Sequence, residues 1–411
     1  MRYGAITREE NEILTRTGPG TPAGELFRRY WQPAALSEEL PAGGAPLPIR
    51  MLSEELVLFR NETGELGLLS RHCAHRGSDL SYGRLEDGGL RCIYHGWLYG
   101  VDGRCLEKPG EPVDSPFYQE VGLTAYPCRE LSGLIFAYLG PGVPPVLPAY
   151  PPLRAPDEYR MTKKRFADCN YLTAHEGNMD PHHVFFLHRD NRRPGDDRRD
   201  PSEDYAAVLP EVEVEETEFG GQLYAVSRIG PETNRVSTSC FLLPNINSTS
   251  GRRGGFQIAW HVPIDDYTHH RFNVTFQKDV PLDQQDRDRF VSELGEGYRL
   301  VRNKSNRYLQ DRESMKTDNY SGIGRTNSPQ DACVQETMAG GAIPDRTREY
   351  LCPEDCGPVA VRQRLLRAIR DVQEGREPPH VLRDEAASRF DIYVGATELP
   401  SSENWRHFWE R

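Results

Sequence analysis

The stretch RHCAHRGSDLSYGRLEDGGLRCIYHGWLYG, residues 71–100, carries two pairs of side chains that commonly bind metals. One residue separates Cys73 from His75, and two residues separate Cys92 from His95. Sixteen residues lie between the two pairs, so each half of the stretch supplies one thiol and one imidazole. Regular repetition of this kind indicates a single metal centre held by two loops.

Two kinds of centre use these ligand types. Structural zinc sites commonly begin with Cys-x2-Cys and end with His-x3–5-His, which is a different division of the ligands. A Rieske [2Fe–2S] centre has two cysteines on one iron and two histidines on the other. Gly77 and Gly96 follow the ligands, where tight loops bring backbone amides near cluster sulfurs. The pattern therefore predicts a Rieske centre, with a zinc-stabilised binding module as the alternative.

Composition limits the remaining classes. The chain has 411 residues, and 50 basic against 62 acidic residues give a net charge of −12. An acidic balance argues against nucleic acid as a partner. No apolar run approaches a membrane span, and the N-terminus lacks the apolar centre of a secretion signal. Nine scattered cysteines are typical of reduced thiols and metal ligands. We expect no membrane partner and a cytoplasmic location.

The patterning predicts an α+β chain with two domains after an N-terminal arm at 1–29. Residues 30–142 contain short β-type runs and Gly-containing turns, which predict an all-β Rieske domain. A Pro-rich connector at 140–156 marks the boundary, so the catalytic domain is expected at 143–411. Strand-like runs there precede helical patterns, and 189–204 reads as a charged loop.

The helix GPVAVRQRLLRAIRDVQ is the clearest helical pattern in the second domain. Its apolar residues recur at helical spacing and form one stripe. The stripe consists of Val361, Leu365, Ala368, Ile369 and Val372. We therefore expect an antiparallel sheet surrounded by helices, of the helix-grip type.

A second group of candidate ligands lies in CNYLTAHEGNMDPHHVFFLHRD, residues 169–190. His183 and His188 are five positions apart, which on a regular helix separates them by about 140°. Both can reach one metal only if the helix is broken or locally widened there. Asp180 precedes His183 by three positions and belongs to this group. The alternative is that Asp180, followed by Pro181, simply caps a helix.

Both groups together resemble one protein family. The first stretch resembles the Rieske signature Cys-x-His-x15–17-Cys-x2-His, and Asp-x2-His-x4-His resembles the mononuclear iron motif of Rieske non-haem iron oxygenases. The chain is similar to catalytic (alpha) subunits of the phthalate dioxygenase type over most of its length. Similar segments include 14–37, 262–266 and 330–351.

The resemblance implies a mononuclear Fe(II) bound by His183, His188 and one carboxylate. His182 breaks the motif spacing and is taken as a neighbour. The carboxylate candidates are Asp318, Asp331, Glu336 and Asp345. Asp331 is preferred, because SPQDACVQE resembles the family segment that holds the third ligand; its alternative role is a charge in the first turn of a helix.

The resemblance also implies O2 activation with electrons from a separate flavin/ferredoxin-type reductase. It implies a homotrimer or a dimer of trimers, in which Asp180 links His183 to His95 of a neighbouring subunit. The expected reaction is hydroxylation, as cis-dihydroxylation, of an aromatic acid or related aromatic compound. Arg189, Arg228 and Arg235 are candidates for binding a substrate carboxylate. The alternatives are O-demethylation of an aryl ether and, more remotely, electron transfer without catalysis.

Overall fold

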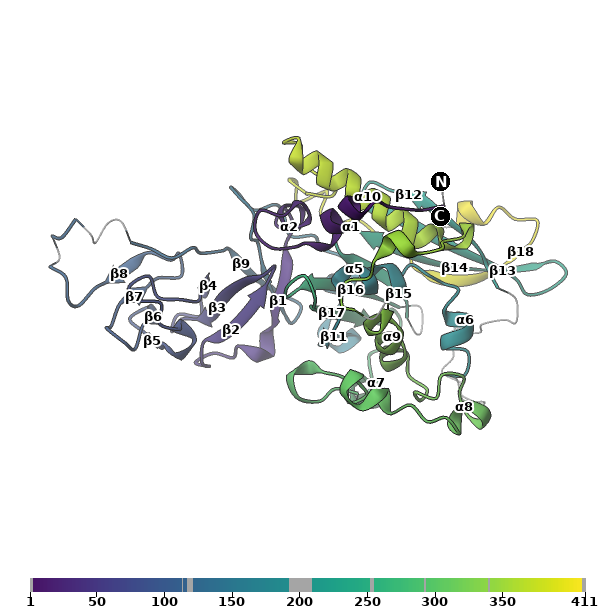
Figure 1. Ribbon diagram of the computed structural model, residues 1–411, viewed down its shortest axis with the longest axis horizontal. Coiled ribbons are helices and arrows are strands. Elements are labelled where there is room, and N and C mark those ends of the chain that lie inside the picture. Colours follow the sequence, from purple (N-terminus) through teal and green to yellow (C-terminus); the bar gives the residue numbers. More distant parts are fainter. Residues whose placement is uncertain are drawn as a thin grey trace.

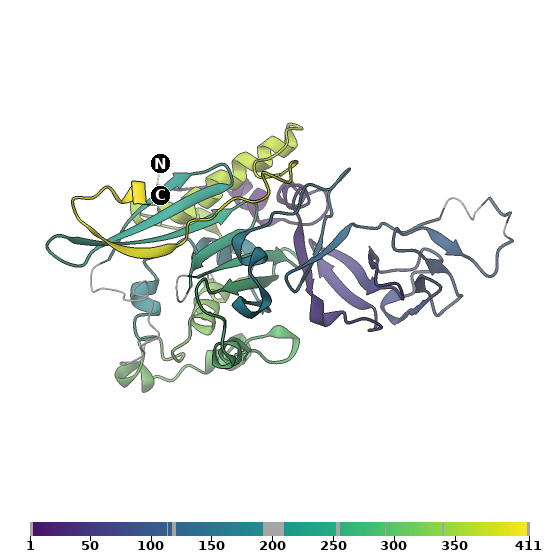
Figure 2. The ribbon, with the colours of Figure 1, turned by 180° about the vertical axis from the view of Figure 1, so that it is seen from behind.

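The computed structural model describes residues 3–112, 114–116, 121–191, 209–251, 255–291, 293–338 and 341–408. The charged loop expected at 189–204 lies outside these residues from position 192 onward. Figure 1 shows two lobes, one built from small strands and one from a larger sheet with helices, and Figure 2 shows the same lobes from behind. No helix among the described residues is both long enough and apolar enough to cross a membrane.

The first lobe contains three small antiparallel sheets. Their strands are β1 (Gln32–Leu36), β10 (Leu134–Ala137) and β9 (Cys128–Leu131); β2 (Leu47–Met51), β3 (Glu54–Arg60) and β4 (Leu66–Ser70); and β5 (Arg84–Glu86), β6 (Gly89–Arg91), β7 (Leu98–Tyr99) and β8 (Cys105–Glu107). Strand β3 is buried on both faces. Leu56 and Leu58 join the main core, whereas Val57 and Phe59 join a separate core under the Cys-His loops. This strand therefore anchors the loops to the rest of the chain.

The second lobe is organised by one eight-stranded antiparallel sheet. Its strand order is β11 (Arg160–Ala167), β17 (His269–Phe276), β16 (Phe256–Pro263), β15 (Ile246–Ser250), β14 (Thr233–Leu242), β13 (Gly220–Arg228) and β12 (Glu211–Glu216), with β18 (Gly395–Pro400) paired to β14. Strand β11 lies at the edge of the sheet and pairs with β17 along its whole length. This ladder lies beside the functional site.

Helices cover the sheet. Along α10 (Cys356–Gln373), the predicted stripe is buried at four positions and partly buried at Val372. This helix packs on β12, β13 and the N-terminal α2 (Pro22–Phe27). The other helices are α1 (Arg8–Thr15), α4 (Pro151–Arg154), α5 (Tyr171–Gly177), α6 (Val184–Leu187), α7 (Gln284–Val291), α8 (Ser314–Thr317) and α9 (Asn327–Glu336). The predicted fold class, an all-β domain followed by an antiparallel sheet with surrounding helices, is confirmed.

The first thirty residues pack on the second lobe. The hydroxyl group of Tyr171 donates a hydrogen bond to the carbonyl oxygen of Leu14 at 2.7 Å. The side-chain amide of Asn170 donates to the carbonyl oxygen of Thr15 at 3.0 Å. Both contacts join α1 to the start of α5, which leads directly into the region of His183.

Candidate metal centres

The two Cys-His loops have the same backbone hydrogen bonds. The amide of Cys73 donates to the Ser78 carbonyl at 2.8 Å, and the amide of Gly77 donates back to Cys73 at 2.8 Å. In the second loop, Cys92 donates to the Trp97 carbonyl at 2.8 Å and receives the amide of Gly96 at 3.0 Å. Both glycines have positive φ values, +73° and +76°, which glycine adopts without strain. The two loops therefore have the same backbone geometry.

The two types of candidate ligand in these loops differ in their exposure to solvent. The thiols of Cys73 and Cys92 are buried, whereas the rings of His75 and His95 are exposed. The two imidazole centroids are 4.4 Å apart. Two buried thiols and two exposed imidazoles in neighbouring loops fit a binuclear cluster with cysteines on the inner iron and histidines on the outer iron. The four residues predicted from sequence are therefore brought together.

Three further residues surround this site. The Tyr99 hydroxyl lies 3.2 Å from the Cys73 sulfur and accepts the Ala74 amide at 3.2 Å. Burial and the hydrogen bond with Cys73 raise the pKa of Tyr99, so the hydroxyl keeps its proton. Trp97 stacks on His75 with centroids 4.7 Å apart and an interplanar angle of 6°. These contacts orient one thiol and one imidazole.

The second site is built around a break between two helices. Helix α5 ends at Gly177, and α6 contains only the four residues between His183 and His188. His188 leaves helical geometry with φ −106° and ψ 3°. The two imidazole rings lie edge to face, with centroids 5.1 Å apart and planes at 81°. The residues between the two histidines are therefore helical, and regular helical geometry ends at His188.

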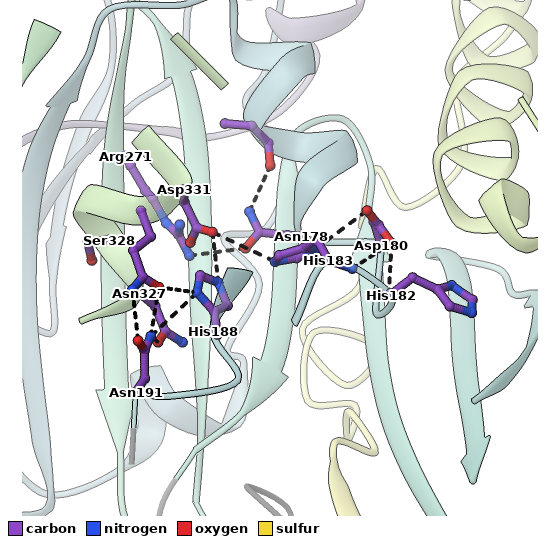
Figure 3. Close-up of polar contacts among 12 residues, drawn as sticks. Asn178, Asp180, His182, His183, His188, Asn191, Arg271, Asn327, Ser328 and Asp331 are labelled. Carbon is purple, nitrogen blue, oxygen red and sulfur yellow. Dashed lines mark hydrogen bonds and ion pairs between the residues drawn. The ribbon is translucent and has the colours of Figure 1, made fainter. Parts of the chain in front are cut away.

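Asp331 on α9 completes this group. Its Oδ1 lies 2.9 Å from Nε2 of His188 and 3.7 Å from Nε2 of His183. One ligand atom from each of the three residues lies within 4.8 Å of the other two. Figure 3 shows Asp331 pointing between the two rings. Two imidazoles and one carboxylate are the donor set of a facial triad that leaves positions open for oxygen.

The remaining ring nitrogens are held by side-chain oxygens. Nδ1 of His188 lies 2.6 Å from Oε1 of Gln330, and Nδ1 of His183 lies 3.6 Å from Oδ2 of Asp180. Because an amide or carboxylate oxygen only accepts, each Nδ1 carries the proton and each Nε2 keeps its lone pair. This arrangement prepares both Nε2 atoms for a metal. Asp331 Oδ1 is buried and receives no hydrogen bond from the described residues, which also fits a metal ligand.

Electrostatics keep the carboxylates of this site ionised. Burial raises the pKa of Asp331, but His188, His183 and Arg271 lower it to about 2 overall. Burial lowers the pKa of His183, but the hydrogen bond to Asp180 and the charge of Asp331 raise it above its ordinary value. The anionic carboxylates and the histidines therefore stabilise one another.

The other carboxylate candidates lie elsewhere. Asp318 forms an ion pair with Arg325 at 2.7 Å, and Asp345 accepts the amide of Thr347 at 3.2 Å. Glu336 accepts the hydroxyl of Tyr308 at 2.7 Å. None of the three belongs to the group formed by the two histidines and Asp331. His182 also points away, with Nε2 3.1 Å from the carbonyl oxygen of Pro210.

The sequence pattern alone did not identify Gln330 as the partner of His188, although it directly precedes Asp331. Position 178 carries another residue that was not predicted, because Asn178 contacts both Arg271 and His261. Its amide group donates to Nε2 of His261 at 3.1 Å, and its oxygen accepts from Arg271 at 3.3 Å. The only sequence signal for either residue was its proximity to an expected ligand.

Comparison with known proteins tests the family. Residues 30–127 match the Rieske [2Fe-2S] domain model, and residues 137–410 match the model described as LigXa C-terminal domain like. The phthalate 4,5-dioxygenase oxygenase subunit of Pseudomonas putida is 34% identical over 90% of this chain and 88% of its own length. The chain belongs to the Rieske oxygenase family. It is therefore a Rieske-type oxygenase, and its cofactors are a [2Fe–2S] cluster and a mononuclear iron.

A second curated relative and one solved structure extend the comparison for this Rieske oxygenase. The 5,5'-dehydrodivanillate O-demethylase oxygenase subunit of a Sphingobium species is 32% identical over 93% of this chain and 85% of its own length. A solved structure of the reduced complex between oxygenase and ferredoxin in carbazole 1,9a-dioxygenase has a TM-score of 0.56 at 21% identity. That match covers 94% of this chain and 99% of the other, so the fold is shared along almost the entire chain.

Proposed function

We propose that this Rieske oxygenase is the terminal component that cis-dihydroxylates an aromatic acid or a related aromatic compound. The observation that carries the proposal is the convergence of His183, His188 and Asp331 in the same chain as the two Cys-His loops. A Rieske electron carrier has no use for this second group of ligands. The relatives named for phthalate and for dehydrodivanillate support an aromatic substrate.

In this proposal, Cys73, His75, Cys92 and His95 hold the [2Fe–2S] cluster. His183 and His188 hold the mononuclear iron through Nε2, and Asp331 holds it through its carboxylate. When bound, the iron supplies the chemistry of O2 activation, for which the cluster provides electrons.

The surrounding side chains have positioning roles. Gln330 accepts the Nδ1 proton of His188 at 2.6 Å, which fixes the plane of that ring. Asp180 faces Nδ1 of His183 and accepts the backbone amide of His182 at 2.9 Å. Asp180 therefore holds the backbone just before the short helix and orients one proposed ligand at the same time.

We further propose that electrons pass between subunits. In Figures 1 and 2 the strands β5–β8 lie at one end of the chain, and α6 and α9 lie in the other lobe. The exposed rings of His75 and His95 share their tip with two exposed apolar side chains, Ile93 and Tyr94, which suits a protein contact. These features support a homotrimer or a dimer of trimers, in which Asp180 links His183 to His95 of the neighbouring subunit.

The electron source is proposed to be a separate flavin/ferredoxin-type reductase. The solved relative in complex with ferredoxin supports a ferredoxin-type partner. A cytoplasmic location is proposed because none of the nine cysteines, all of which lie in the described residues, forms a disulfide bond, as is typical of a reducing compartment. We also propose the domain division 1–29, 30–142 and 143–411.

The function is tested with the purified protein, an NADH-driven flavin/ferredoxin reductase and a panel of aromatic acids. We expect three irons per chain, two from the cluster and one mononuclear, and a cis-diol product. An iron content of two with no O2 uptake would identify a carrier and contradict the proposal.

The Asp180→Asn variant tests the intersubunit link. An asparagine caps a helix about as well as an aspartate, so capping alone predicts a mild effect. An amide presents one acceptor oxygen and an NH2 group that opposes a ring N–H, so the link predicts slow electron transfer. The measurement is single-turnover oxidation of the pre-reduced cluster with substrate and O2. Near-normal rates of cluster oxidation in a trimer with intact iron would contradict the proposed intersubunit link.

O-demethylation of an aryl ether is the second candidate. A relative named as an O-demethylase oxygenase subunit matches 93% of this chain at 32% identity, which favours this candidate. The same ligands serve both reactions, because the orientation of the substrate decides which carbon faces the iron. Formaldehyde release from methoxyarenes, without diol formation, would select O-demethylation.

A further inference from the structure

Three cationic side chains lie together on the β11–β17 ladder beside the proposed iron ligands. In the register of this ladder, Arg165 stands directly opposite Arg271. Lys163 precedes Arg165 by two positions and therefore lies on the same face of β11. Like charges directly opposite each other destabilise an antiparallel pair. Arg165 and Arg271 nevertheless stand opposite each other, and Arg165 is only 6% exposed, so solvent screens its charge little.

The two guanidinium groups have few protein partners. Arg271 donates through Nη2 to Oδ1 of Asn178 at 3.3 Å, and Arg165 donates through Nη1 to the Ser328 carbonyl at 3.0 Å. The Nε atoms of both arginines are buried without a hydrogen-bond partner among the described residues. Both observed partners are neutral oxygens, and within the described chain neither guanidinium group has a carboxylate within 4.0 Å. Among the described residues, the two guanidinium groups of Arg165 and Arg271 therefore lack a contacting counter-charge.

Nearby acidic groups do not compensate for this excess of positive charge. Burial lowers the pKa of Arg271 to about 10, with Arg165 adding to that shift and Asp331 opposing it. Burial likewise lowers the pKa of Lys163 to about 8, with the charges of Arg271 and Arg165 adding to that shift and Glu293 opposing it. Asp331 belongs to the proposed metal site, so its negative charge is already engaged. Buried charges are costly unless they are paired, so an anion that enters this site would be stabilised.

A carboxylate suits this position by shape as well as by charge. Its two oxygens lie in one plane and accept two parallel N–H groups from a guanidinium fork. Figure 3 shows the Arg271 side chain reaching past Asp331 toward Asn178. An aromatic acid held here by its carboxylate would lie beside the ligands that the oxygenase reaction requires.

We propose that Arg165 and Arg271 form the subsite that binds the carboxylate of an aromatic acid substrate. This inference rests on the proposed oxygenase function and names its specificity-determining residues. Lys163 contributes positive charge behind them.

Two of the three arginines expected from the sequence, Arg189 and Arg228, are engaged elsewhere. Arg228 is exposed and donates to the carbonyl oxygen of Pro231 at 2.6 Å. Arg189 lies over the ring of Tyr320 and 3.6 Å from the carboxylate of Asp190. Arg228 therefore serves as the control position, since it is exposed and has its own backbone partners.

The experiment compares the holoenzyme with its Arg165→Gln and Arg271→Gln variants, and with Arg228→Gln as the control. The probes are benzoate, phthalate and 3-chlorobenzoate, each beside its neutral carboxamide. Dissociation constants and thermal midpoints are measured for every pair. We expect the wild type to bind at least one acid about tenfold or more tightly than its amide, as charged hydrogen bonds contribute in other proteins. Both Gln variants should lose this preference, whereas Arg228→Gln should keep it.

Stability distinguishes a binding role from a structural role. Removing one of two facing guanidinium groups relieves repulsion, so the ligand-free Gln variants should melt at or above the wild-type temperature. Aromatic acids should then fail to raise their midpoints. The Arg271→Lys variant keeps the charge without the fork and should retain part of the preference for acids. Gln variants that are less stable than the wild type, yet still prefer the acid, would overturn the subsite.

The outcomes separate the subsite from the proposed function. Oxidation of neutral aromatics by a wild type that shows no preference for acids would overturn the subsite and leave the oxygenase function standing. Acid binding that depends on Arg271, without O2 uptake for any aromatic compound, would support the subsite and overturn the proposed function.

Discussion

The two metal centres of this chain are assembled in opposite ways. The four proposed cluster ligands lie between residues 73 and 95, in two loops with the same hydrogen bonds. The iron-site residues come from separate elements, and His188 and its partner Gln330 are 142 positions apart. The cluster histidines are exposed at the end of one lobe, whereas His188 is buried within the other.

This difference follows from what each centre must do. An electron carrier must be approached by other proteins, and exposed imidazoles on short loops allow that approach. A site that activates O2 needs an environment shielded from water and a carboxylate brought in from elsewhere in the chain. The first centre therefore depends on local loop geometry, and the second on the packing of α9 against the sheet.

The largest expected effect separates the two centres completely. His188→Ala should remove the mononuclear iron, leaving about two irons per chain and the visible spectrum of the cluster. His75→Ala should alter or abolish that spectrum while the mononuclear iron remains. Iron analysis and visible spectroscopy of both variants provide the measurement. Loss of both signals in either variant would show that the two sites are not independent.

Acid should destabilise the second lobe more than the first. Burial lowers the pKa of His269 to about 3 and those of His175 and His380 to about 4, far below the unfolded value. The unfolded chain then binds protons that the folded chain does not, so stability is present above pH ~6.5 and decreases as pH falls toward 4. Each such histidine should cost about 1.4 kcal/mol per pH unit in that window.

Urea unfolding of the iron-free protein between pH 7 and 4 measures this loss. The slope of unfolding free energy against pH gives the number of protons taken up on unfolding. His269→Gln should reduce that number by about one, and the same change at the exposed His72 should not. A stability that does not vary between pH 6.5 and 4 would contradict the assignment of these histidines as buried and neutral.

A smaller effect is expected from the partner of His188. Gln330→Leu removes the oxygen that accepts the Nδ1 proton, so iron affinity should fall by about 10–100-fold. The cluster spectrum should not change, because the two centres share no ligand. Gln335, a second buried glutamine on α9, provides the matched control, and Gln335→Leu should bind iron normally. Equal losses in both variants would indicate damage to the helix instead.

The smallest effect concerns the cluster. The Tyr99 hydroxyl lies 3.2 Å from the Cys73 sulfur, and a hydrogen bond to sulfur stabilises the more negative, reduced cluster. Tyr99→Phe should therefore lower the midpoint potential by about 20–60 mV. Tyr82→Phe, at an exposed position, is the control. An unchanged potential would mean that this contact does not reach the cluster.

Much of this protein was determined by short-range sequence. The predicted fold class and the Rieske family are confirmed. Both predictions were possible because short β-type runs, the helical stripe of α10 and the Cys-His spacing each depend on residues close together in the sequence. The spacing of His183 and His188 on a regular helix also showed that both rings could reach one metal only with a departure from regular helical geometry, and the short helix α6 ends at His188. Covalent connectivity over a few residues was sufficient for these inferences.

Other features were decided only by tertiary structure. The family resemblance preferred Asp331 among four candidate carboxylates, but its position 2.9 Å from His188 depends on the packing of α9. The same packing selected Gln330 as the partner of His188. Pairing of β11 with β17 placed Arg165 opposite Arg271, although 106 positions separate them (271 − 165). The physical reason is that spacing along the chain constrains close neighbours, whereas contacts across more than one hundred residues depend on how the whole core packs.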